Sequence, residues 1–188
     1  STNRRLVGGK RLSDVDDPDL HQGYVELRSR PTQRGGGSTA TRIGRQELAL
    51  GRERLVGALD WSNVRRSFDG ISVTRARGRR TLTAFAVRPV LQQEHRFNRW
   101  DEHTEFFGAH SIFESAARDR RMEVYWLRLN RTVGAERRQT AGVRLSGGGA
   151  QRRGDYDIET AYQFGKLGGA RIEAWMVSAV LGRRLSAS

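Results

Sequence analysis

The sequence predicts an all-β fold of antiparallel strands. Polar and apolar residues alternate along much of the chain, most clearly in DYDIETAYQF at 155–164, where charged and apolar side chains would face opposite sides of a strand. Glycine-rich or charged turns separate such stretches, as in GRR at 78–80 and GGG at 147–149. No amphipathic helical pattern competes with this alternation. We therefore expect about nine strands, repeating every 15 to 20 residues or so.

Two regions follow from this pattern along the chain. Residues 1–22 are polar and irregular and predict a loop, and residues 23–188 carry the strands. Longer connections are expected at 52–66, which contains Gly57, and at 91–104, which is charged and aromatic. The expected strands cover 23–30, 39–50, 67–77, 81–90, 105–116, 121–131, 139–146, 155–164 and 170–181.

The length of these strands leaves two architectures open. Most approach the roughly 9 to 11 residues that a tilted membrane strand requires, whereas strands of soluble sandwiches are usually shorter. Arginines and carboxylates recur in the middle of strands, opposite the apolar positions. A sandwich would place them on its solvent face and a large barrel would line its lumen with them, so periodicity alone favours neither.

Charge indicates a polyanionic partner. The net charge is +13, the isoelectric point is near 11.4, the mean hydropathy is −0.68, and of 34 basic residues only Lys10 and Lys166 are lysines. Arginine pairs through two N–H groups with carboxylate or phosphate, which suits nucleic acid, anionic lipid or an acidic polysaccharide. A GC-rich coding sequence would explain the same arginine excess equally well.

Several classes of protein are disfavoured. The chain has no cysteine, so it has no disulfide or thiolate metal site, and it has no apolar run of the roughly 20 residues that a spanning helix needs. The acidic residues at 14–19 lack the spacing of a calcium loop, and the four histidines lack the HExxH arrangement. No Ser-His-Asp set can be argued from spacing. We expect no cofactor, no metal and no enzymatic activity.

One ordered block lies between Gly44 and Gly70. It consists of GRQEL at 44–48, Gly51, RLVG at 54–57, WSN at 61–63 and RSFDG at 66–70. The block resembles the signature of the alginate-export family of outer-membrane β-barrels. DYDIETAYQFG at 155–165 and the pair Ala174-Trp175 resemble later strands of the same family.

The resemblance implies an antiparallel up-and-down transmembrane β-barrel of about eighteen strands in the bacterial outer membrane, of which this chain supplies about 8 to 10. The chain would then be part of a larger barrel, since half a barrel leaves two unpaired edges; a small closed barrel of eight or ten strands is the alternative. The implied activity is passage of an anionic polysaccharide such as alginate, or of other anionic solutes. Outer-membrane lipid and periplasmic export proteins are the other implied partners, and no nucleic acid is expected.

Within that interpretation, arginines in and beside the strands are expected to line the lumen and bind carboxylates weakly, while interspersed acids keep them extended. The predicted lumen bases are Arg42 or Arg45, Arg65, Arg66, Arg75, Arg88, Arg128 and Arg144, and the balancing acids are Glu47, Asp69, Asp157 and Glu159.

The chief rival hypothesis is a soluble, arginine-rich β-domain that binds nucleic acid or another polyanion. It accounts for the charge equally well. Against it, the acids share strand faces with the bases, which weakens any continuous basic surface. A polysaccharide lyase is a third hypothesis, but no Arg, His and Tyr constellation is assembled by the spacing.

Overall fold

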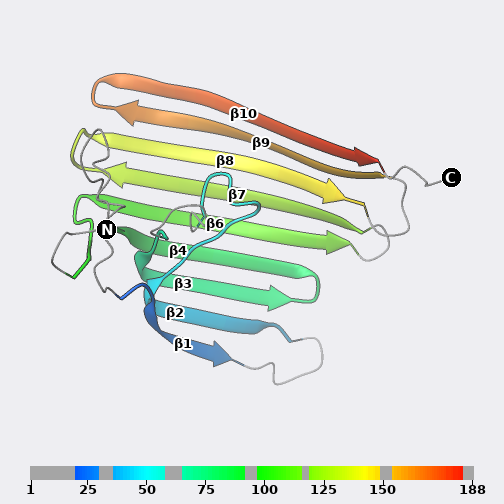
Figure 1. Ribbon diagram of the computed structural model, residues 1–188, viewed down its shortest axis with the longest axis horizontal. Helices are drawn as coiled ribbons and strands as arrows, with labels where there is room; N and C mark the ends of the chain where they lie inside the picture. Colours follow the sequence, from blue (N-terminus) through cyan, green and yellow to red (C-terminus); the bar gives the residue numbers. More distant parts are fainter. Residues whose placement is uncertain are drawn as a thin grey trace, which may run out of the picture.

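A computed structural model of the chain describes residues 20–29, 36–57, 65–91, 97–115, 119–148 and 154–183. Ten strands form one antiparallel meander within these ranges (Figure 1). Their bounds are β1 (Gly23–Ser29), β2 (Ser38–Gln46), β3 (Phe68–Arg77), β4 (Arg80–Leu91), β5 (Arg99–Trp100), β6 (Thr104–Ser115), β7 (Arg120–Arg131), β8 (Glu136–Gly147), β9 (Gly154–Leu167) and β10 (Ala170–Arg183).

The strand order follows the sequence. The hydrogen-bonded path is β1-β2-β3-β4-β6-β7-β8-β9-β10, and the short β5 pairs only with β4. The all-β antiparallel fold and the strand number are as predicted. Among the described residues β1 and β10 do not pair, so the alternative of a small closed barrel is wrong for this sheet. Because nine antiparallel strands make up the path, β1 and β10 run in the same direction and cannot close it with an antiparallel pair.

Several strand boundaries differ from the expectation. β2 ends at Gln46, four residues early, because the chain then turns onto the sheet and buries Leu48. β8 begins at Glu136, since the preceding tight turn ends with Gly134 and Ala135 at φ values of 80° and 48°. The connection at 91–104 contains β5 but is otherwise irregular where it is described.

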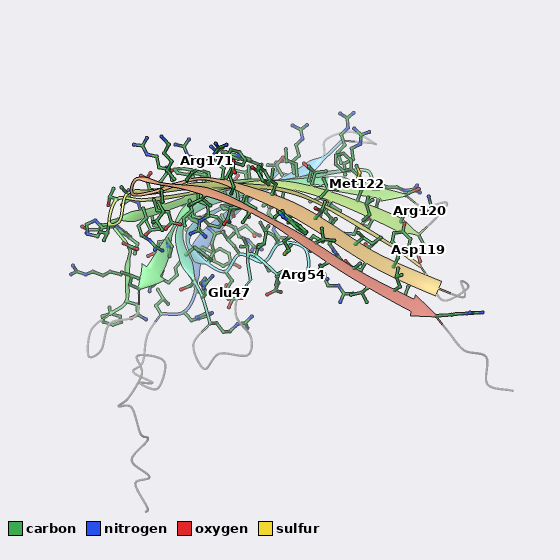
Figure 2. The ribbon with its side chains drawn as sticks, turned by 90° about the horizontal axis from the view of Figure 1, so that it is seen from above. Glu47, Arg54, Asp119, Arg120, Met122 and Arg171 are labelled. Carbon is green, nitrogen blue, oxygen red and sulfur yellow. The ribbon has the colours of Figure 1, made fainter. Side chains whose placement is uncertain are left out.

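The register divides the side chains between two faces. Cross-strand partners share a face, and the pairs Glu123 with Arg144 and Arg144 with Glu159 place these three residues together. We call this the inner face, and the opposite one the outer face. Figure 2 shows the sheet as an arch, with Glu47 and Arg54 beneath its concave side and Arg171 above it.

The two faces have opposite chemistry. The buried charged strand residues Glu123, Glu136, Arg144, Asp157 and Glu159 all lie on the inner face. Large apolar side chains are exposed on the outer face, where Trp175 and Leu181 of β10 are each 78% exposed. A water-soluble domain has the reverse arrangement, with apolar side chains inside.

A small apolar cluster lies on the inner face. Leu48 and Val56, from the connection after β2, pack against Phe68, Phe85, Val87, Tyr125, Leu127 and Ala161 of the strands. The connection therefore lies across the inner face of the sheet. We call its described residues 47–57 the inner loop. No helix among the described residues is long and apolar enough to cross a membrane.

Candidate functional site

The centre of the inner face is a network of buried charges around Arg144 on β8. Its Nε and Nη2 donate to Oδ1 and Oδ2 of Asp157 on β9 at 2.9 and 2.5 Å, and its Nη1 donates to Glu123 on β7. Adjacent strands bring the three side chains to one face at nearly the same level. The arginine thus uses the two-pronged geometry that makes guanidinium–carboxylate pairs strong and directional.

Glu123 is the most enclosed carboxylate of this network. It is 1% exposed, and it contacts His110 Nε2 at 2.8 Å and Arg121 Nε at 3.0 Å in addition to Arg144. A buried carboxylate is costly unless it is paired and hydrogen-bonded. Its own strand β7 and the flanking strands β6 and β8 supply those partners, so the inner face can hold charge away from bulk water.

The inner loop joins this network through two arginines. Arg52 Nε lies 2.8 Å from Asp157 Oδ2, and Arg54 contacts Asp157 at 3.6 Å and also donates to Glu159. Glu159 additionally accepts a hydrogen bond of 2.9 Å from Tyr125 Oη. Ion pairs therefore fasten the loop to β9, and the apolar contacts of Leu48 and Val56 fasten it to β3, β4, β7 and β9.

The loop has its own backbone hydrogen bonds. Leu50 N–H donates to Val56 O at 3.0 Å, and Glu53 N–H donates to Leu50 O at 2.9 Å. These bonds hold the segment that carries Arg52 and Arg54 in a compact turn. The loop thereby holds Arg52 and Arg54 against the acids of β9.

A groove of about 490 Å³ lies beside the inner loop. Its basic side chains are Arg66, Arg131 and Arg138, and Phe68 and Phe106 supply aromatic surface; its other lining residues are Leu55, Val56, Pro89, Val90, Leu91, Thr104, Leu127, Leu129, Thr140 and Gln163. One acid, Glu136, contacts Arg131 at 3.5 Å and also pairs with Arg138. The three arginines therefore carry more positive charge than this one acid neutralises.

The first two strands carry a separate polar pair on the same face. Glu26 accepts a hydrogen bond of 2.5 Å from Arg42 Nε and another from Arg28. The Arg42 guanidinium also lies 5.0 Å from the centre of the Tyr24 ring, within range of a cation–π contact. The inner face thus carries a second group of charged pairs on β1 and β2, separated from the network around Arg144 by the uncharged inner positions of β3 and β4.

The predicted lumen residues fall into three groups. Arg42, Arg144, Asp157 and Glu159 lie on the inner face, and Glu47, Arg65 and Arg66 lie in the connection between β2 and β3. On the outer face are Arg45, Asp69, Arg75, Arg88 and Arg128. A lumen lining by all of them stays a prediction, and the register shows that they do not share one face.

The structure pairs several of these predicted residues with each other. Arg45 Nε and Nη2 donate to both carboxylate oxygens of Asp69 at 2.9 and 3.0 Å, and Arg65 Nε lies 2.9 Å from Glu47 Oε1. Arg144 and Asp157 form the pair described above. Arg88 instead contacts Glu105, at 3.3 Å.

Sequence reasoning missed several inner-face residues. Glu123, Glu136, Arg138 and His110 were not singled out, although Glu136 and Arg138 alternate in step with Arg144 on β8. Glu123 shares its strand face with Tyr125 and Leu127, opposite Arg128, which was predicted to face the lumen. Because Arg128 set the expected lumen side of β7, alternation pointed away from Glu123. Arg52 and Arg54 are in a loop whose fold onto the sheet has no periodic signature.

The structure offers no site for a metal where it describes the chain, because no group of three or more histidines or acids there could hold one. The acidic residues at 14–19 and the histidine at 95 lie outside the described residues.

Comparison with known protein families places the chain in one of them. A family model described as alginate export matches residues 1–188 of the chain. No curated protein and no solved structure matches it.

Proposed function

Because this chain belongs to the alginate export family, as the block from Gly44 to Gly70 predicted, we propose that its sheet forms part of the wall of an outer-membrane channel. The inner face borders a water-filled lumen and the outer face contacts lipid. The channel passes an anionic polysaccharide such as alginate. Its work is passage and not catalysis.

The observation that carries this proposal is the opposite polarity of the two faces. Membrane barrels alternate apolar, lipid-facing residues with polar, lumen-facing ones along each strand. In β9, Ile158 and Tyr162 are exposed on the outer face, whereas Asp157 and Glu159 are buried on the inner face. In water, the outer face would expose apolar surface from β1 to β10, which favours aggregation.

The free edges of β1 and β10 support a larger barrel. Unpaired backbone N–H and C=O groups cannot face the hydrocarbon core of a bilayer, so both edges need partner strands. The path has nine strands, and β1 and β10 run in the same direction. An odd number of further strands would therefore complete an antiparallel barrel with the even count of bacterial outer-membrane barrels.

The arginines of the inner face provide a path for carboxylates. Arg66, Arg131 and Arg138 line one groove and outnumber Glu136, so a polymer carboxylate can bind there through forked hydrogen bonds. Nearby acids compete for the same arginines and keep each binding site shallow. Several weak sites in sequence allow a polymer to advance, because no one site holds it for long.

The inner loop narrows this path. Arg52 and Arg54 place it against Asp157 and Glu159, on the side of the sheet that we assign to the lumen. A passing polyanion meets these arginines before it reaches the buried acids of the strands. The loop therefore contributes both a constriction and positive charge.

The test is a bilayer recording with a charge-matched pair of variants. We expect the complete barrel that contains this sheet, once purified, to form anion-selective channels whose current is blocked by alginate oligomers. The double variant Arg66→Gln, Arg131→Gln should weaken block by about tenfold, because each substitution removes a charge-assisted contact to the polymer. Glu136 keeps its ion pair with Arg138 in this variant. Arg128→Gln with Arg137→Gln removes equal charge from the outer face and should leave block unchanged.

Two results would contradict the proposal. One is the absence of conductance, and the other is equal weakening of block by both variant pairs. A protein that stays soluble without detergent and binds DNA with a steep salt dependence would instead support the nucleic-acid hypothesis.

A further inference from the structure

We propose that the end of the outer face at the β3–β4 turn binds the phosphate of an anionic lipid headgroup. This inference rests on the proposed function, because it requires the outer face to contact lipid. It assigns a site that the polymer, on the other side of the wall, does not reach.

The site is built around a two-residue turn. Arg77 ends β3, Arg80 begins β4, and the two are paired across the turn formed by Gly78 and Arg79. Gly78 has a φ of +58°, which suits glycine at the first position of a type II′ hairpin turn. The tight turn therefore holds three arginines within four consecutive positions, and all three are exposed.

A hollow accompanies these arginines. It measures about 600 Å³ and is lined by Gly36, Arg77, Gly78, Arg79, Arg80, Phe113 and Glu114. The Arg80 guanidinium lies 5.6 Å from the centre of the Phe113 ring, and Arg79 O accepts a hydrogen bond of 2.9 Å from Glu114 N–H. β6 thus braces the turn, and three cations face one carboxylate.

More arginines extend the cluster along the same end of the outer face. Arg75 of β3, Arg120 of β7 and Arg183 of β10 occupy outer-face positions there. No acid occupies an outer-face position at this end of the described strands, since Glu114 and Asp155 are on inner-face positions and Asp119 is in a turn. Figure 2 shows Arg120 and Met122 at this end.

The opposite end of the outer face is different. Its bases are interspersed with acids, because Arg88 contacts Glu105 and Arg171 pairs with Glu173. Arg128 there donates to Asn130. The excess of arginines over acids is therefore concentrated at the β3–β4 end.

A lipid fits this arrangement better than a free anion. The arginines lie where the apolar surface ends, next to Leu82 and Phe113 of the outer face. A lipid could place its acyl chains on that surface and its phosphate among the guanidinium groups at once. Juxtamembrane basic residues attract anionic headgroups in this way, and arginine is well suited to phosphate.

The experiment measures lipid retained by the purified full chain, by native mass spectrometry after extraction from bilayers that contain equal amounts of phosphatidylglycerol and phosphatidylcholine. The variant is Arg77→Gln, Arg79→Gln and Arg80→Gln together. The control is Arg128→Gln, Arg137→Gln and Arg171→Gln, which removes equal charge from the other end of the outer face. The single variant Arg79→Gln changes only a residue of the turn, so it separates a loss of lipid binding from misfolding of the triple variant.

We expect the wild-type protein and the control to retain phosphatidylglycerol in preference to phosphatidylcholine. The variant with all three turn arginines replaced should retain about tenfold less phosphatidylglycerol, and Arg79→Gln should retain an intermediate amount. Equal retention of both lipids, equal loss in both triple variants, or displacement of the lipid by inorganic phosphate at equal concentration would overturn the inference. Membrane insertion and conductance report on the proposed function separately. Failure to insert overturns both, whereas insertion without a lipid preference overturns this inference alone.

Discussion

Arg144 and Asp157 are diagonal neighbours on adjacent strands and share a two-pronged ion pair on the inner face, with N–O distances of 2.9 and 2.5 Å. The direct cross-strand partner of Arg144 is Glu159. The remaining guanidinium nitrogen of Arg144, Nη1, donates a hydrogen bond to Glu123. One cation thus holds carboxylates from the strands on either side. This arrangement makes Arg144 the most consequential single charge on the inner face.

Replacing Arg144 by methionine should strongly destabilise the sheet. Glu123 and Asp157 would remain buried with less compensation, and breaking a buried pair from one side typically costs about 3–5 kcal/mol. Arg128→Met, on the exposed outer side of β7, should change the free energy of unfolding by no more than about 0.5 kcal/mol. Urea unfolding of both variants in detergent micelles measures the difference, and equal effects would show that the network around Arg144 carries little stability.

The contact between Arg54 and Glu159 should couple the inner loop to β9. Arg54→Ala and Glu159→Gln each remove one side of the pair, and the double variant should cost less than the sum of the two by about 0.5–3 kcal/mol, as expected for residues in contact. Arg54→Ala should also increase proteolysis of the inner loop. Strict additivity, together with unchanged proteolysis, would mean that this ion pair does not fasten the loop.

Gly142 makes room for the Tyr125 ring, which lies directly across from it on the inner face. A Cβ at Gly142 would lie 2.3 Å from Tyr125 Cζ, so Gly142→Ala must displace the ring and disturb its hydrogen bond to Glu159. We expect a loss of about 1–3 kcal/mol, as for other overpacked sites. Gly169→Ala is the matched control, because nothing lies within 4 Å of its added Cβ. Thermal unfolding should separate the two variants clearly.

Asp101 should make the start of β6 sensitive to acid. Burial works to raise the pKa of its carboxyl, but hydrogen bonds from Thr104 Oγ1 and His103 N–H outweigh burial and hold the pKa below its ordinary value. A lowered folded-state pKa stabilises the structure above the unfolded-state pKa, and this contribution is lost as the pH falls through the folded value.

Hydrogen exchange of the amides at 101–104 measures this effect. Exchange, corrected for its intrinsic pH dependence, should accelerate only in strong acid in the wild-type protein. In Asp101→Asn it should be faster near neutral pH and lose that acid dependence. The same acid-dependent profile in the variant would assign the effect to another group.

Alternation along single strands could be read from the sequence, and it placed Asp157 and Glu159 opposite Ile158 and Tyr162 correctly. It could not show which face of each strand matches which face of its neighbour, because that depends on register across turns. Arg75, Arg88 and Arg128 were therefore grouped with Arg144 although they lie on the other face.

The rest of the candidate site depends on contacts distant in sequence. Arg54 and Glu159 are 105 residues apart, and nothing local to either predicts that the inner loop folds back onto β9. The glycines at 44 and 51 and the charge of the inner loop were recognised as distinctive, but their meaning depends on the sheet beneath them. Family membership was recognisable because the residues of the signature are contiguous enough to be read directly.

The central claim is that the outer face contacts lipid and the inner face borders water, and spin labels along β10 test it most directly. The chain has no cysteine, so single cysteines introduced at positions 174 to 179 can be labelled without background. In reconstituted bilayers, labels at 175, 177 and 179 should be relaxed by oxygen, which concentrates in lipid, and labels at 174, 176 and 178 by a water-soluble nickel chelate. A clear period of two with this phase is the predicted result, and uniform access of the nickel chelate to all six positions would contradict the account.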